Sequence, residues 1–67
     1  MSVAKVTEIS ASSATSFEDA IKSGLQRASK TLKNIKGVWI KEQECAVEGG
    51  EITEFRVIMK VTFVLED

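Results

Sequence analysis

The chain has 67 residues, nearly balanced charges and few side chains suited to catalysis or metal binding. Nine lysines and arginines oppose ten aspartates and glutamates, for a net charge of −1, and no basic tract indicates nucleic acid as a partner. The chain has no histidine and a single cysteine, Cys45, which excludes an internal disulfide and argues against a transition-metal site. Because no apolar run approaches the roughly 20 residues of a membrane span, we expect a soluble, cytoplasmic protein without a membrane partner.

The length predicts one domain, residues 1–67, with a small core. A chain of this size buries only about 60% of the surface that its unfolded form exposes. Natural domains this small are reinforced by disulfides, a metal ion or oligomerisation. Since the first two are disfavoured here, we expect a homo-oligomer.

The first half predicts a short strand, a loop and a helix start. Residues Val3 to Ile9 alternate and are rich in β-branched side chains, which is typical of a strand. Ser10 to Ser16 is small and polar and is expected to form a loop. Ser16 precedes Asp19 by three residues, close to the spacing of a capping box, so Ser16 is the expected N-cap.

A long helix is predicted next, because apolar residues recur with helical periodicity for about five turns. We expect this stripe to face the core, and the small Gly24 and Ala28 to permit a close approach to a sheet. Gly37 is expected to close the helix in the left-handed conformation. The apolar stripe consists of Phe17, Ala20, Ile21, Gly24, Leu25, Ala28, Leu32 and Ile35.

The second half predicts a β-hairpin. Strands are expected over about Val38 to Val47 and Ile52 to Leu65, joined at Gly49 and Gly50, which adopt positive φ angles at little steric cost. One face of the last strand is nearly all apolar and comprises Thr53, Phe55, Val57, Met59, Val61, Phe63 and Leu65.

These elements define an α+β fold of β-α-β-β order. A single helix between the first two strands is a crossover connection, so those strands should run parallel, with the third antiparallel between them. The predicted strand order is therefore 1-3-2, with the helix on the apolar face. The opposite face should remain uncovered and available to a partner or ligand, and it carries Trp39, Arg56, Ile58, Lys60 and Val64.

Trp39, the only tryptophan, lies on the more polar face of its strand. Alternation places Val38 and Ile40 on one face and Gly37, Trp39, Lys41 and Gln43 on the other. Two interpretations are open: a side chain buried at a fold or subunit contact, or a stacking platform for a planar ligand. If symmetry brought two copies together, an isologous contact would double the platform.

Polar groups that could accompany such a platform are few. Gln43 and Arg56 are the best placed to hydrogen-bond a polar ring edge or a phosphate. The alternative for Arg56 is an ion pair with Glu54 or with a carboxylate of a neighbouring chain. Glu42 and Glu44 share a strand face and are interpreted as solvated surface charge, and Cys45 as a small hydrophobe.

No catalytic residues are predicted. The chain lacks histidine and tyrosine, and its serines form no Ser/His/Asp constellation. No P-loop or dinucleotide-binding glycine pattern occurs. Binding is therefore the expected kind of function.

Several segments in their order and spacing resemble the dodecin family over essentially the whole chain. They are Lys5–Ile9, Ser16–Ala20, Ala28–Leu32 followed by Asn34 and Ile35, Phe55–Val57 and Lys60–Asp67.

The resemblance implies a β-α-β-β subunit in a hollow dodecamer of cubic-type symmetry. It also implies a non-catalytic protein that stores riboflavin, FMN or FAD, with flavins paired between tryptophans across a two-fold axis. The alternative is a dodecin-like assembly that binds coenzyme A or metal ions, or that has a structural role.

The ligand site departs from the family pattern at two positions. The stacking tryptophan of typical members aligns with Gly37, whereas Trp39 lies two residues later, on the same strand face and displaced by about 7 Å. The glutamine that addresses the flavin ring aligns with Arg56, which has donors and no acceptor. Glu42 aligns with an acidic residue near the ribityl chain. The flavin interpretation therefore places Trp39 as the stacking residue, beside Gly37, with Arg56 and Gln43 at polar ligand atoms and Glu42 near the sugar chain.

Overall fold

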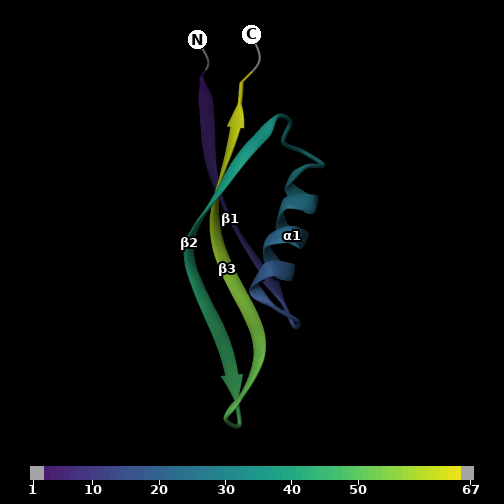
Figure 1. Ribbon diagram of the computed structural model, residues 1–67, viewed down its shortest axis with the longest axis vertical. Helices are drawn as coiled ribbons and strands as arrows, with labels where there is room; N and C mark the ends of the chain where they lie inside the picture. Colours follow the sequence, from purple (N-terminus) through teal and green to yellow (C-terminus); the bar gives the residue numbers. More distant parts are fainter. Residues whose placement is uncertain (1–2, 66–67) are drawn as a thin grey trace.

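The computed structural model describes residues 3–65, in which a single helix packs on one face of a three-stranded sheet (Figure 1). The sheet order is β1-β3-β2, and β3 is antiparallel to both neighbours. Strands β1 and β2 therefore run parallel to each other, which confirms the predicted β-α-β-β fold and strand order. The elements are β1 (Ala4–Ser13), α1 (Phe17–Ala28), β2 (Ile35–Glu48) and β3 (Glu51–Val64).

Strand β1 is longer than the sequence pattern predicts. The expected serine-rich loop is wrong for its first part, since Ser12 and Ser13 still pair with Arg56 and Phe55 on β3. The fourteen-residue β3 offers backbone partners along this whole length, and ladder hydrogen bonds outweigh the weak loop preference of serine.

The start of α1 is as predicted. Ser16 is the N-cap, and its Oγ accepts a hydrogen bond of 3.0 Å from the backbone N–H of Asp19. Ser13 Oγ donates to Asp19 Oδ2 at 2.7 Å, so the same residue also ties the helix start to the end of β1.

The end of α1 corrects the sequence-based prediction. The helix stops at Ala28 instead of continuing toward Ile35, and it is Asn34, with φ of 62°, that adopts the left-handed conformation. Gly37 lies within β2. Ser29 Oγ donates to the carbonyl of Leu25 at 2.7 Å, and such side-chain bonds to the backbone compete with continued helix.

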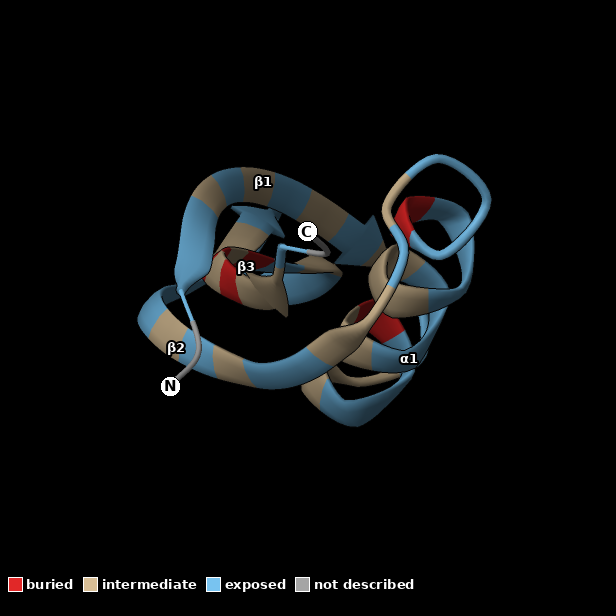
Figure 2. Cartoon of the chain, turned by 90° about the horizontal axis from the view of Figure 1, so that it is seen from above, coloured by how far each residue is buried: buried red, intermediate tan, exposed pale blue. Residues whose placement is uncertain are grey.

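The core lies between α1 and β3. Val57, Met59 and Val61 of β3 and Ala20 of α1 are fully buried (Figure 2), which confirms the predicted apolar face. Gly24 permits the close approach, because a Cβ built there would lie 2.7 Å from Met59 Cε and 3.0 Å from Ala11 Cβ.

The single chain is elongated and leaves much apolar surface exposed. It extends over 52 × 19 × 13 Å, and the turn of the β2–β3 hairpin lies beyond the N-terminal start of α1 (Figure 1). Gly49 and Gly50 form the turn with the expected positive φ angles, and next to it Val47 and Ile52 are more than half exposed. The accessible surface is 5029 Å², against about 4,200 Å² for a folded monomer of this mass. No helix among residues 3–65 is long and apolar enough to cross a membrane.

The close approach at Gly24 predicts an intolerance of larger side chains. We expect Gly24→Val to lower the free energy of unfolding by about 2 kcal/mol or more, because it overpacks the contact with Met59 and Ala11. Urea unfolding followed by circular dichroism measures the change.

Gln26→Val is the matched control, since Gln26 is exposed on the same helix and the variant introduces the same β-branched side chain. Equal losses of stability in the two variants would contradict the packing role of Gly24.

Candidate functional site

The sheet face turned away from α1, called the outer face below, carries Trp39. Residues directly opposite each other in an antiparallel ladder point to the same side. Trp39 pairs with Lys60, which alternates with the buried Met59 and Val61 and so faces away from the helix. The Trp39 side chain is 70% exposed. The prediction that it projects from a face left uncovered within the chain is confirmed.

Gly37 lies on the outer face beside Trp39 and opposite Thr62. Nothing approaches within 4 Å of the position that a Cβ at Gly37 would occupy. Within the single chain, the exposed indole of Trp39 therefore lies beside a position, Gly37, where no other side chain fills the space.

A β-bulge interrupts the alternation of β2 just after Trp39. Ile40 pairs with Met59 and Glu42 pairs with the next residue of β3, Ile58, so Lys41 is the extra residue. Beyond the bulge, Glu42 and Glu44 lie on the outer face. Gln43 pairs with the buried Val57 instead and therefore lies on the α1 side of the sheet.

The expected placement of Gln43 beside Trp39 is thus wrong, because strict alternation does not hold across the bulge. Glu42 shares the face of Trp39 because of the bulge. Strict alternation would have placed it on the opposite face, and only the family resemblance implied a position near the ligand. Cys45, which follows on the α1 side opposite Phe55, is half-buried with a free thiol.

One lysine contacts Trp39, and a second lies two residues further along β2. Lys60 Nζ lies 5.5 Å from the centre of the indole ring, in a cation–π contact. Lys41 Nζ lies 2.9 Å from Glu8 Oε1, so this ion pair spans β3 and joins the two edge strands. The hydrogen bond to Glu8, together with the charge of that carboxylate, raises the pKa of Lys41 above its usual value.

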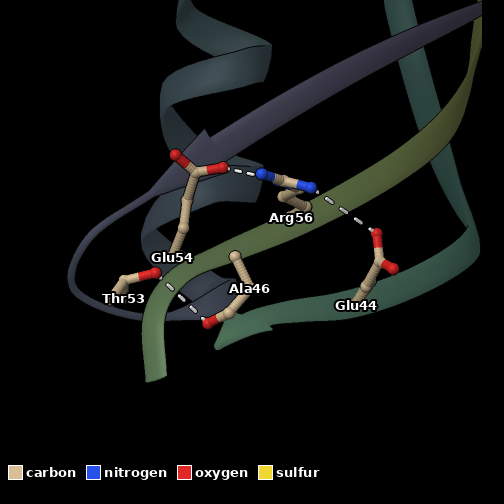
Figure 3. Close-up of polar contacts among 5 residues, drawn as sticks. All are labelled: Glu44, Ala46, Thr53, Glu54 and Arg56. Carbon is tan, nitrogen blue, oxygen red and sulfur yellow. Dashed lines mark hydrogen bonds and ion pairs between the residues drawn. The ribbon is translucent and has the colours of Figure 1, made fainter. Parts of the chain in front are cut away.

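Arg56 lies farther along β3 and is held by two carboxylates (Figure 3). Its Nε donates to Glu54 Oε1, and its Nη1 lies 3.9 Å from Glu44 Oε1. The hydrogen bond to Glu54 and that carboxylate's charge raise the pKa of Arg56. The ion-pair interpretation of Arg56 is confirmed for Glu54. Four residues separate Arg56 from Lys60, about 13 Å along the strand.

The outer face therefore has two chemically different ends. One end presents an exposed indole with Lys41, Lys60 and Glu8. The other presents Arg56 between carboxylates, next to a shallow hollow of about 260 Å³ lined by Glu42, Gln43, Glu44 and Ile58.

Two further features of the chain bear on ligands. A groove of about 580 Å³ runs between β1 and α1 and is lined in part by Ile9, Gly24, Arg27 and Leu32. Within residues 3–65, no three histidine, cysteine or acidic side chains are grouped so as to hold a metal ion.

The grouping of Lys41, Lys60 and Glu8 around Trp39 does not follow from the sequence pattern. Lys60 is recognisable as an outer-face residue from the periodicity of β3, whereas its contact with the indole depends on the register between β2 and β3. The bulge at Lys41 has no turn-type residue to signal it.

Comparison with known proteins identifies the family. The family model for Dodecin matches residues 3–66, and the chain belongs to the dodecin family. A calcium dodecin from Mycobacterium tuberculosis is 35% identical over 63 residues, covering 94% of this chain and 89% of that protein.

Solved structures agree on the fold. A dodecin from Streptomyces davaonensis superposes with a TM-score of 0.92 and 33% identity, covering 98% of this chain and 97% of the other. A calcium-chelating dodecin from Mycobacterium tuberculosis with a calcium-binding site gives a TM-score of 0.81 and 34% identity, covering 96% and 91%. Dodecins are small binding proteins.

The bulge yields a prediction about deletions. Removing Lys41 leaves Ile40 opposite Met59 and Glu42 opposite Ile58, so we expect the fold and the sheet register to persist with the Lys41–Glu8 ion pair lost. Removing Ile40 instead places Lys41 opposite the buried Met59, and we expect a loss of about 2 kcal/mol or more from the missing apolar contact. Urea unfolding of both deletion variants measures the difference, and equal stabilities would contradict this register.

Proposed function

We propose that the chain is a non-catalytic, cytoplasmic flavin-binding storage protein that holds riboflavin, FMN or FAD between the subunits of a homododecamer. The observation that carries the proposal is the exposed Trp39 on a sheet face that α1 does not cover. An indole offers a wide, rigid π-face for stacking on an isoalloxazine. Because each chain has one tryptophan, a two-fold contact between subunits supplies the second ring of a sandwich.

The surroundings of Trp39 fit a flavin in part. The open space above Gly37 accommodates the plane of the ring system. The polar edge of an isoalloxazine has two carbonyl acceptors on either side of one N–H donor. Arg56 would donate to a carbonyl, using Nη2, which its contacts with Glu54 and Glu44 leave available, and the carboxylate of Glu42 would accept from the N–H.

Gln43 fits the site less well, because its side chain lies on the α1 side of β2. In this proposal it contributes to the ligand only through the rim of the hollow that it shares with Glu42 and Glu44. The polar contacts at the ring edge therefore come from charged groups, in place of the amide that typical members of the family use.

The excess surface of the single chain supports the assembly. The surface exceeds that of an average monomer by about 800 Å², which is about the area that one partner contributes to a standard protein interface. The open edges of β1 and β2 provide backbone groups for pairing between chains.

Calcium is the second candidate ligand, because the similar Mycobacterium tuberculosis protein is a calcium dodecin. Calcium takes six to eight oxygen ligands. No three histidine, cysteine or acidic side chains within residues 3–65 are grouped to hold a metal, so such a site would add backbone or water oxygens, or carboxylates from a second chain, to the acidic side chains of this one. Glu42 and Glu44 on the outer face are the residues available for this role. If neither flavin nor calcium bound, the function would be coenzyme A binding or a structural role.

Fluorescence titration tests the flavin proposal. We expect riboflavin or FMN emission to be quenched on adding protein, with saturation near one flavin per chain. Trp39→Ala should weaken binding by about 10- to 100-fold, given that aromatic stacking contributes about 1–3 kcal/mol per base in comparable sites. Trp39→Phe, which keeps a flat ring, is the matched control. Its affinity for flavin should lie between those of the parent protein and Trp39→Ala.

Two results would contradict the proposal. Undiminished flavin emission with the parent protein would exclude flavin as the ligand. Unchanged affinity in Trp39→Ala would exclude Trp39 as the stacking residue.

Thermal unfolding distinguishes calcium from flavin. A ligand that binds only the folded state raises the melting temperature. We expect calcium to raise it no more than an equal concentration of magnesium does. A calcium-specific increase that disappears in the Glu42→Gln, Glu44→Gln double variant would replace the flavin proposal with a calcium one.

A further inference from the structure

The cation nearest to Trp39 is Lys60, and within residues 3–65 it is not paired with a carboxylate. Lys60 lies opposite Glu8 on one side and Trp39 on the other. The carboxylate of Glu8 is bound by Lys41 at 2.9 Å, and the Lys60 ammonium lies over the indole. None of the ion pairs in this part of the chain involves Lys60. Its charge is therefore available to a ligand that stacks on Trp39.

Arg56 is in the opposite situation. Glu54 and Glu44 both contact its guanidinium, so the charge of this group of three side chains is negative. The group at Trp39, formed by Lys41, Lys60 and Glu8, is positive. An anionic substituent on a stacked ring is consequently attracted toward Lys60 and repelled from the end of the outer face that holds Arg56.

We propose that Lys60, assisted by Lys41, forms a subsite for the phosphate monoester of a flavin mononucleotide, and that the chain thereby selects phosphorylated over unphosphorylated flavin. The inference rests on the proposed flavin-binding function. The lysine ammonium supplies three donors on a flexible stem, and the stem lets it leave the indole face to meet a phosphate. Lys41 adds a second positive charge and holds Glu8, so that the acidic side chain does not compete for Lys60.

Paired titrations with FMN and riboflavin test the subsite. For the parent protein at low ionic strength, we expect FMN to bind about ten-fold more tightly than riboflavin, which is the effect of one charge-assisted hydrogen bond to phosphate. Raising the ionic strength should reduce this ratio, because an exposed ion pair is screened by salt. Lys60→Met should bring the ratio close to one, and Lys60→Arg should retain it.

Lys22→Met is the matched control. It removes the same charge from the exposed side of α1, where Lys22 pairs with Glu18, and should leave the ratio at the parent value. Size-exclusion chromatography of each variant checks that the size of the parent assembly is retained. The ratio of the two affinities separates the phosphate contact from any general change in stacking at Trp39.

The outcomes distinguish the inference from the function on which it rests. Equal binding of FMN and riboflavin by the parent would overturn the phosphate subsite and leave flavin binding intact. Loss of the preference in Arg56→Met, with Lys60→Met unaffected, would place the phosphate at Arg56 and overturn the inference as well. Failure of both flavins to bind would overturn the function and the subsite together.

Discussion

The packing of α1 against β3 is the contact on which the rest of the structure depends. Ala20, Val57 and Met59 form its buried centre, and Gly24 brings the helix close enough for Met59 to fill the space. The one helix among residues 3–65 covers only one side of the sheet. The other side, together with the hairpin beyond the helix, is left with Trp39, Val47 and Ile52 exposed. The short chain therefore has two consequences. It limits how much of the chain is buried, and it leaves a broad surface open to other subunits and ligands.

Charge is distributed unevenly over that surface. Lys60 lies over the indole at one end, near the Lys41–Glu8 ion pair, whereas two carboxylates contact Arg56 at the other end. The exposed indole is thus bordered by charged side chains on both sides along the face. A ligand that matches this face combines an apolar plane with polar groups of defined charge.

The sequence predicts the strand order and the core well and predicts the boundaries less well. The apolar period of β3 and the crossover rule suffice for the order β1-β3-β2 and for burial of Val57, Met59 and Val61. The predicted helix is too long because Leu32 and Ile35 happen to continue its apolar period, although they are apolar for a different reason. Both residues lie beyond Ala28, where Ile35 already pairs with Phe63 of β3.

The candidate site is predicted in part for a similar reason. The faces of Trp39 and Arg56 follow from alternation, whereas the face of Glu42 is contrary to it and agrees only with the family resemblance. The position of Gln43 does not, because a bulge is a property of two paired strands and leaves little trace in either sequence. The contact between Lys60 and Trp39 likewise depends on inter-strand register.

The bulge at Lys41 also changes how ligand positions are to be compared between relatives. When a strand bulges out one extra residue, the residues after the bulge keep their partners on the neighbouring strand. A residue's number in the chain then no longer gives its position in the sheet. The location of Trp39 in the sheet is defined by Lys60, its partner across the ladder. Residues of such sites in related chains are therefore best aligned by the β3 residue that lies opposite them.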